Sequence, residues 1–340
     1  MGEEKLMKKK RWMIAAAALL VCLGVGCSGK SEERQVSEDK RLIVYTSHKE
    51  EVYGPIIREF EERTGIWVDV RAGGTTELLN AIREGGEGVC DVMFGGGVES
   101  LEAYRECFEP YGCRQKELMD QEFVSPEDSW TAFSELPIVF IYNHKLVLPE
   151  NAPESGAELI TDKWKGQIAF ADTRKSGTSY TILATMIQAL GEDEEQVLEA
   201  FAAALDGNIS AGSGEVVSEV SSGKRLVGIT LEETARKKIR QGADISMAYP
   251  KEGTSAVPDG TALVKGAPHP DNARLFIDFT VSEDVQQLLV DQFLRRPVRQ
   301  GIRQDEEVKA VKLLPFDLDW AGMHQDRILS LWQEIMEREQ

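Results

Sequence analysis

Short apolar runs alternate with amphipathic segments along this chain, and the alternation restricts the possible fold more than any other feature. Apolar runs at 42–45, 67–70 and 89–94 are each followed by a turn rich in Gly, Ser, Thr or His and then by a helical pattern. Strands that alternate with helices in this way predict a mostly parallel sheet with helices on both faces. We therefore expect an α/β fold.

A second series of strands and helices follows the first. Its apolar runs lie at 137–142, 168–171, 226–229 and 245–249, and the run 262–264 with a helix at 271–280 returns the chain to the first sheet. Two sheets predict two lobes, which we assign as residues 41–133 with 257–340 (lobe one) and residues 134–256 (lobe two). Chain crossings near Phe133 and Ser255 would then act as a hinge between the lobes.

Helix starts and stops can also be predicted from local residues. Ser47 with Glu50, and Thr230 with Glu233, have the spacing of a capping box, in which each side chain caps the backbone of the other. Pro55 interrupts the first helical pattern and is expected to restart the helix at its own first turn.

The N-terminus has the pattern of an export signal. A basic block at 8–11 precedes an uncharged run at 12–25, and small residues lead to Cys27. The run is shorter than the roughly 20 apolar residues of a membrane span. The polar segment 28–40 lacks the apolar residues of a core, so we interpret it as a flexible tether.

The residues around Cys27 resemble a bacterial lipoprotein signal, although Leu23 lies one position further from the cysteine than is usual. The resemblance implies that residues 1–27 are a lipoprotein signal peptide with Cys27 as the lipidation site. The protein would then be exported and anchored by lipid in the cell envelope, in the periplasm or on the outer face of the cytoplasmic membrane. The alternative is an ordinary cleaved signal with an incidental cysteine.

The charge of the chain excludes one class of partner. The net charge is −19, and the segment before Cys27 holds five basic and two acidic residues, so the remainder carries −22. Proteins that bind nucleic acid need a basic face, so no nucleic-acid partner is expected.

The cysteines and histidines suggest no metal or cofactor. Cys107 and Cys113 are close enough in sequence for a disulfide, which export would permit, while the alternative is that they and Cys90 are free thiols. No histidine lies near a cysteine pair at metal-site spacing, so neither a metal nor a cofactor is predicted.

Four polar turns carry the functional prediction: 46–48, 74–76, 95–97 and 176–180. In open α/β sheets, ligands bind beyond the carboxyl ends of the strands, where helix N-termini present unpaired N–H groups and a partial positive charge. Glycine and hydroxyl residues let an anion approach such a turn closely. The turns therefore predict a small anionic ligand held between the two lobes.

Four segments resemble the ferric-type substrate-binding proteins of bacterial ABC importers: LIVYTSH at 42–48, DVMFGGGVESL at 91–101, ADTRKSGTSY at 171–180 and YPKEGTSAVPDGTALV at 249–264. The resemblance covers nearly the whole chain after residue 40. It implies a two-lobed type II periplasmic-binding fold with the ligand cleft between the lobes. Members of this branch bind phosphorylated sugars, phosphonates or other small organic phosphates, and others bind ferric iron.

The turns and the resemblance together nominate the ligand-binding residues: Ser47, His48, Thr75, Thr76, Gly95, Gly96, Gly97, Ser176, Gly177, Thr178, Ser179, Tyr180, Thr230, Glu232 and Ser255. Simpler structural roles stay open, since Ser47 and Ser176 could be helix caps and the three glycines could form a tight turn. Arg295 and Arg296 are assigned to solvated surface or to contacts between the lobes.

Ferric iron is the alternative ligand. For the iron-binding branch, the resemblance implies a site with two adjacent tyrosines. The seven tyrosines of this chain include no adjacent pair. His48 remains at a position that could serve iron. A phosphorylated or phosphonate compound therefore fits the sequence better.

No catalytic motif accompanies these residues: GxSxG and HExxH patterns are absent from the sequence. We expect a monomeric binding protein, not an enzyme, that passes its ligand to an ABC permease and so acts indirectly with the ATPase. A sensory role, in which the loaded protein instructs a membrane receptor kinase, is the alternative.

Overall fold

The computed structural model describes residues 37–191, 193–304, 308 and 310–339. Residues 1–37 and 38–340 are separate units, and the second contains both sheets. The signal peptide, Cys27 and most of the tether lie outside the described residues. Among the described helices, none is both long enough and apolar enough to cross a membrane.

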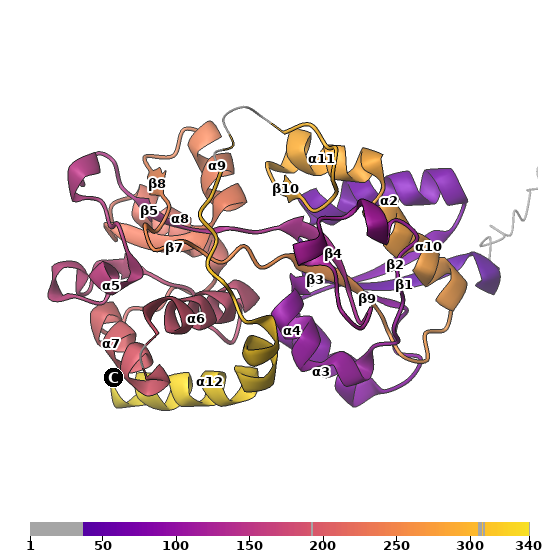
Figure 1. Ribbon diagram of the computed structural model, residues 1–340, viewed down its shortest axis with the longest axis horizontal. Coiled ribbons are helices and arrows are strands. Elements are labelled where there is room, and N and C mark those ends of the chain that lie inside the picture. Colours follow the sequence, from indigo (N-terminus) through magenta and orange to yellow (C-terminus); the bar gives the residue numbers. More distant parts are fainter. Residues whose placement is uncertain (1–36, 192, 305–307, 309, 340) are drawn as a thin grey trace, which may run out of the picture. The chain divides into compact units, whose positions relative to one another are not determined.

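Sheet one has six strands in the order β10-β4-β9-β3-β1-β2 (Figure 1). Strand β1 pairs in parallel with β2 and β3, whereas β9 runs antiparallel to β3 and β4. The strands are β1 (Arg41–Thr46), β2 (Trp67–Ala72), β3 (Val92–Gly97), β4 (Thr131–Glu135), β9 (Asp259–Leu263) and β10 (Arg296–Pro297).

Sheet two has four strands in the order β6-β7-β5-β8. They are β5 (Ile138–Tyr142), β6 (Ile168–Ala169), β7 (Val227–Leu231) and β8 (Ser246–Ala248). Only β6 and β7 are parallel here, so five of the eight strand pairings in the two sheets are antiparallel. The prediction of a mostly parallel sheet was wrong because apolar runs reveal strands but not the direction from which a returning strand enters the sheet.

Helices surround both sheets. Those around sheet one are α2 (Glu50–Thr64), α3 (Thr75–Gly85), α4 (Val98–Ala103), α10 (Pro270–Thr280) and α11 (Glu283–Phe293). The others are α5 (Gly156–Leu159), α6 (Gly177–Leu190), α7 (Glu194–Leu205), α8 (Ser213–Ser221), α9 (Glu232–Arg240) and α12 (Leu318–Arg338). Short 3₁₀ turns lie at Glu38–Lys40, Arg105–Cys107, Lys116–Leu118, Gln121–Phe123, Pro149–Asn151 and Asp162–Trp164.

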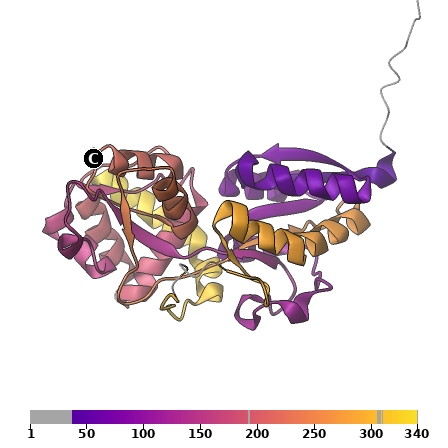
Figure 2. The ribbon, with the colours of Figure 1, turned by 90° about the horizontal axis from the view of Figure 1, so that it is seen from above.

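The first hydrophobic core is built on phenylalanine rings that meet edge to face. The Phe94 ring lies 4.9 Å from Phe133 and 5.4 Å from Phe276, and Phe276 lies 5.1 Å from Phe60. These contacts join β3 to β4 and to helices α2 and α10, which lie side by side (Figures 1 and 2). Burying each ring contributes roughly 1.5–3 kcal/mol before the contact geometry is considered.

The second core includes the C-terminal helix. Trp332 of α12 packs 5.7 Å from both Phe170 and Phe201, whose rings are 5.0 Å apart. The start of α12 also contacts α4, where Gln325 Nε2 donates to Ser100 Oγ at 3.3 Å. Residues 257–340 were assigned to lobe one from the sequence, and α12 within that range contributes its apolar face to the core around sheet two.

The first predicted capping box does not form. Helix α2 begins at Glu50 after Lys49, with no side-chain cap, and Ser47 stays in the turn that follows β1. The turn is held instead by Thr46, whose Oγ1 accepts from the His48 N–H at 3.2 Å. Nor does Pro55 restart the helix: α2 continues through it, because the buried residues on both sides of the proline keep the helix packed on the core.

The second predicted capping box also fails. Helix α9 begins at Glu232 without a side-chain cap. Thr230 is paired with Val139 in the β5–β7 ladder, so strand pairing takes precedence over capping at this position.

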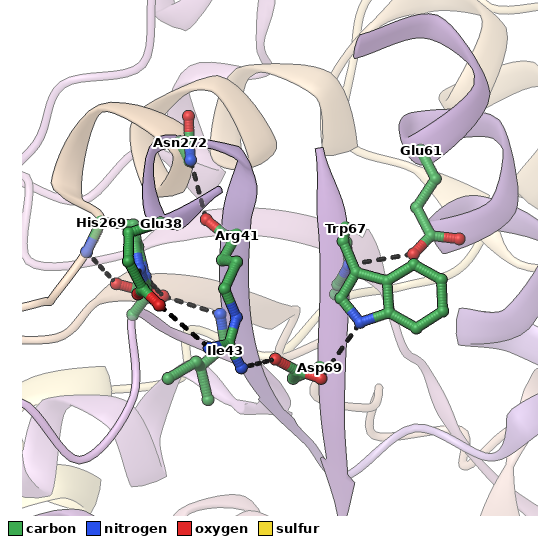
Figure 3. A network of polar contacts seen from close by, with 10 residues as sticks. Glu38, Arg41, Ile43, Glu61, Trp67, Asp69, His269 and Asn272 are labelled. Atoms are coloured by element: carbon green, nitrogen blue, oxygen red, sulfur yellow. Dashed lines mark hydrogen bonds and ion pairs between the residues drawn. The ribbon is translucent and has the colours of Figure 1, made fainter. Parts of the chain in front are cut away.

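A polar network fixes the start of the described chain against sheet one (Figure 3). Arg41 at the beginning of β1 pairs with Glu38 at 3.3 Å and with Asp69 of β2 at 2.6 Å. The Trp67 indole N–H donates to the same Asp69 carboxylate at 3.1 Å. These contacts join β1 to the edge strand β2 near the point where the tether meets the fold.

The three cysteines beyond Cys27 are free thiols. Cys90 and Cys113 are buried and Cys107 is half-buried. The sequence left open whether Cys107 and Cys113 form a disulfide or are free, and in the structure they are free.

Candidate functional site

A cavity of about 530 Å³ lies where loops from both sheets meet. Nine of the nominated residues line it: Ser47, His48, Thr75, Gly96, Gly97, Ser176, Gly177, Thr178 and Thr230. All four predicted turns therefore contribute to one cavity. A larger hollow of about 780 Å³, near Trp130 and Met323, contains none of these turns and is lined by seven carboxylates and one arginine, so it is the weaker candidate for an anion.

Five helices begin at the cavity: α2, α3, α6, α8 and α9. None of the five has a side chain that caps its first turn. Of the helices that begin elsewhere, α5, α7 and α12 are capped by Ser155, Asp193 and Asp317, whereas α10 and α11 also lack a side-chain cap. The cavity thus receives backbone N–H groups that no capping side chain satisfies, together with the positive ends of five helix dipoles.

The glycine turn allows β3 to approach its neighbours closely. Gly95 and Gly96 have φ angles of +104° and +91°. A Cβ on Gly95 would lie 2.7 Å from Ser47 Oγ, and one on Gly96 would lie 2.6 Å from Thr75 Cγ2. Only glycine permits both the backbone conformation and these contacts, so the turn is more than a connection to α4.

His48 is buried in the cavity wall. Its ring contacts Phe94 and Phe133, with centroids 4.5 Å and 5.2 Å away. Burial, and secondarily the charge of Arg295, hold the pKa of His48 well below its ordinary value. The ring is therefore neutral, and its Nε2, 3.6 Å from Asp259 Oδ2, has no hydrogen-bond partner in the described part of the chain.

Arg295 and Asp259 form an ion pair in the same wall, with Arg295 Nη1 2.6 Å from Asp259 Oδ2. Ser134 donates to Asp259 Oδ1 from both its backbone N and its Oγ, at 2.9 Å and 2.7 Å. The Arg295 Nε is buried and has no partner among the described residues. One N–H donor of the guanidinium is consequently still unused beside the cavity.

The sequence left solvated surface and contacts between the lobes as alternatives for Arg295 and Arg296, and solvated surface is wrong for both. Arg295 and Arg296 are each only 8% exposed. The alternative assignment holds for Arg296, which joins the lobes by pairing with Glu232 of α9 at 2.6 Å. The apolar neighbours of the two arginines, Phe293-Leu294 before and Pro297-Val298 after, were the sequence signal for burial.

The cavity lining is basic although the protein is acidic. It includes five cationic side chains and three carboxylates, with the cations being Lys49, Lys175, Lys237, Lys238 and Arg295. Lys237 pairs with Glu51 across the mouth, and this hydrogen bond is the main cause of the lowered pKa of Glu51. The sequence had nominated none of these eight charged side chains as ligand-binding residues.

Six nominated residues do not line the cavity: Thr76, Gly95, Ser179, Tyr180, Glu232 and Ser255. Several of them support it instead. Tyr180 donates to the Ala321 carbonyl of α12, and Ser255 shares a 2.5 Å hydrogen bond with Thr185 of α6. Glu232 binds Arg296 and accepts from the Tyr249 hydroxyl at 2.8 Å.

A sequence profile described as bacterial extracellular solute-binding protein matches residues 93–323, which is more than half of the chain. The chain belongs to this family. The solute-binding protein is 26% identical to iron uptake protein A1 of Synechocystis over 333 residues, covering 89% of this chain and 90% of that protein.

Two solved structures resemble the solute-binding protein. The periplasmic binding protein AfuA of Actinobacillus pleuropneumoniae, solved with fructose-6-phosphate bound, has a TM-score of 0.80 at 24% identity and covers 87% of this chain and 98% of its own. The ferric binding protein of Campylobacter jejuni has a TM-score of 0.79 at 18% identity, covering 86% and 99%. At this identity the two structures establish the fold.

These findings confirm the two-lobed type II periplasmic-binding fold and the resemblance to substrate-binding proteins of ABC importers. The solute-binding protein is an exported transport component that delivers a small ligand to an ABC permease, and its family is not one of enzymes. The similar proteins include both an iron uptake protein and a sugar-phosphate complex.

Proposed function

We propose that this solute-binding protein captures a small phosphorylated or phosphonate compound in the cavity between its lobes. The observation that carries the proposal is the convergence of five uncapped helix N-termini on one cavity with a net basic lining. A phosphate group can accept hydrogen bonds from many such donors at once. Hydrogen bonds to a charged acceptor are also about twice as strong as neutral ones.

Two buried donors support the same ligand. Arg295 Nε and His48 Nε2 both lack partners among the described residues, and both side chains line the cavity. A buried donor without a partner costs about 1–3 kcal/mol, and an anion that satisfies it recovers that free energy on binding. For His48 this requires the tautomer that carries the proton on Nε2.

Ferric iron is a poorer match for this cavity. Ferric ions favour phenolate and carboxylate oxygens, and no tyrosine is among the described residues that line the cavity. The described chain also contains no group of three or more His, Cys, Asp or Glu side chains placed to hold a metal ion. A bare cation would in addition face the positive ends of the helix dipoles.

Titration calorimetry on ligand-free protein tests the proposal. Fructose 6-phosphate, phosphoglycerate and 2-aminoethylphosphonate serve as probes, and ferric citrate serves as the competing ligand. We expect at least one phosphorylated or phosphonate probe to bind more tightly than iron. Tight ferric binding without a response to any of the anions would overturn the anion proposal in favour of iron.

We further propose that Cys27 is lipidated and tethers the protein to the membrane through residues 28–40. The support is the basic block, the uncharged run and the small residues that precede Cys27. Wild-type protein should fractionate with membranes, and Cys27→Ala should be released or misprocessed. Recovery of soluble, unmodified wild-type protein would reject the anchor while leaving the ligand proposal untouched.

A further inference from the structure

A buried hydrogen bond joins the two lobes directly behind the cavity wall. Thr181 Oγ1 of α6 donates to Glu99 Oε1 of α4 at 2.6 Å. Thr181 lines the cavity, and so does Gly97, where an added Cβ would overlap the Glu99 carboxyl group. Glu99 itself is fully buried. An acid that belongs to one lobe is therefore enclosed by contact with the other.

The second oxygen of this acid has no partner. Glu99 Oε2 is buried and makes no hydrogen bond within the described chain. Burial is the main reason that the pKa of Glu99 is raised to about 7, and the nearby charge of Asp259 on β9 raises it further. The Thr181 hydroxyl and the backbone N–H groups of Glu99 and Ser100 act in the opposite direction.

The other groups around Glu99 do not supply a positive charge to hold it ionised. Tyr180 of α6 is neutral, since burial is the main cause that raises its pKa. Asp259 is paired with Arg295, so that guanidinium is already engaged. From α12, Gln325 contacts the neighbouring Ser100 and carries no charge. A carboxyl group enclosed in this way is stabilised in its protonated form.

We propose that Glu99 couples closure of the lobes to the uptake of a proton, so that this protein binds and releases its ligand together with a proton at a site outside the ligand contacts. The coupling rests on the proposed function in one respect, namely that the ligand stabilises the closed arrangement. It does not depend on which anion is bound.

The direction of the pH effect follows from the two environments. With the lobes apart, Glu99 would face water and titrate near its ordinary value of 4.5, whereas in the closed arrangement its pKa is about 7. Because closure raises the pKa of Glu99, protonation of Glu99 stabilises the closed state. This stabilisation is complete below the open-state pKa and is lost as the pH rises through 7. Between pH 6 and pH 8, the Glu99 contribution to ligand affinity should fall about tenfold.

Calorimetry in buffers with different ionisation enthalpies measures the proton directly. Fructose 6-phosphate and 2-aminoethylphosphonate are titrated at pH 7 into the wild type and into Glu99→Gln, whose amide mimics the protonated acid. Because the probe's own titration is common to both proteins, their difference isolates Glu99. We expect the variant to take up about half a proton less per ligand and to lose the tenfold change in affinity. Equal uptake by the two proteins would overturn the coupling.

Glu135 provides the matched control. It lies on β4, and burial also raises its pKa to about 7, but it faces Arg296 and Glu232 rather than Thr181. The effect of Glu99→Gln on proton uptake is therefore measured again in the Glu135→Gln background, where the same difference is expected. If Glu99→Gln no longer changes proton uptake in the Glu135→Gln background, the proton belongs to Glu135 and the role of Glu99 is overturned.

A lobe-locked variant tests the coupling without a ligand. A Cβ on Gly177 of α6 would lie 3.2 Å from Thr75 Cβ of α3, slightly closer than the usual Cβ separation in disulfides. In the oxidised Thr75→Cys/Gly177→Cys protein that also carries Glu135→Gln, infrared titration should show a carboxyl group that loses its proton near pH 7 and is absent after Glu99→Gln. No such signal in the locked protein would overturn the coupling, whereas failure of both probes to bind the wild-type protein would count only against the proposed ligand.

Discussion

Arg295 and Asp259 form a buried ion pair whose loss should be measurable as stability. Arg295→Leu leaves the Asp259 carboxylate buried without its cation, although Ser134 still donates two hydrogen bonds to it. We expect the free energy of unfolding in urea to fall by about 3–5 kcal/mol. The Arg295→Leu/Asp259→Leu double variant should recover much of this loss. A loss below about 1 kcal/mol in the single variant would show that the pair is hydrated in solution.

Thr178 offers a hydroxyl group to the cavity from the first turn of α6. If that hydroxyl donates to the phosphate, Thr178→Ala should weaken binding of the best anionic probe by about 1–3 kcal/mol with little change in thermal stability. Thr161→Ala is the control, because Thr161 is an exposed residue outside the cavity. Equal affinity of the two variants in calorimetry would remove Thr178 from the site.

The glycines at the end of β3 determine how closely this strand approaches α3. Gly96→Ala would combine a φ of +91° with a Cβ only 2.6 Å from Thr75 Cγ2. Gly207→Ala is a matched control, since Gly207 has a φ of +73° with nothing within 4 Å of the added Cβ. Both variants should lose about 1–3 kcal/mol from backbone strain, and Gly96→Ala should lose more and bind the anion more weakly. Similar losses and unchanged binding would show that the turn relaxes without moving Thr75.

Closure of the two lobes is the property of the whole molecule that binding should change. Lobe one at 41–133 and 257–340 and lobe two at 134–256 remain our proposal for the moving bodies, with α12 as the element that touches both cores. An anion that contacts both lobes prefers the closed state and should shift the population toward it. Small-angle scattering should therefore show a smaller radius of gyration with a bound probe, matching the oxidised Thr75→Cys/Gly177→Cys protein. No compaction with a tightly bound probe would contradict hinge closure.

Several elements of this protein followed from the sequence because their causes are local. The apolar run at 42–45 lies within β1, and the turn at 176–180 leads into α6, which ends at Leu190 before Gly191. The polar turns after successive strands could be nominated as a site because strand ends and helix starts meet in α/β folds. Nine of the fifteen nominated residues line the cavity for this reason.

Only the tertiary structure decided the helix starts, the strand directions and the charged part of the cavity. Ser47 and Thr230 could have capped helices, but their backbones serve a turn and a strand instead. Arg295 and Asp259 are 36 residues apart, and their pairing depends on where β9 and the chain after α11 meet in sheet one. The sequence by itself determined the alternating elements, the polar turns and the family resemblance. Which charges are buried together depends on packing between distant segments, because burial, and not residue type, sets the cost of an unpaired charge.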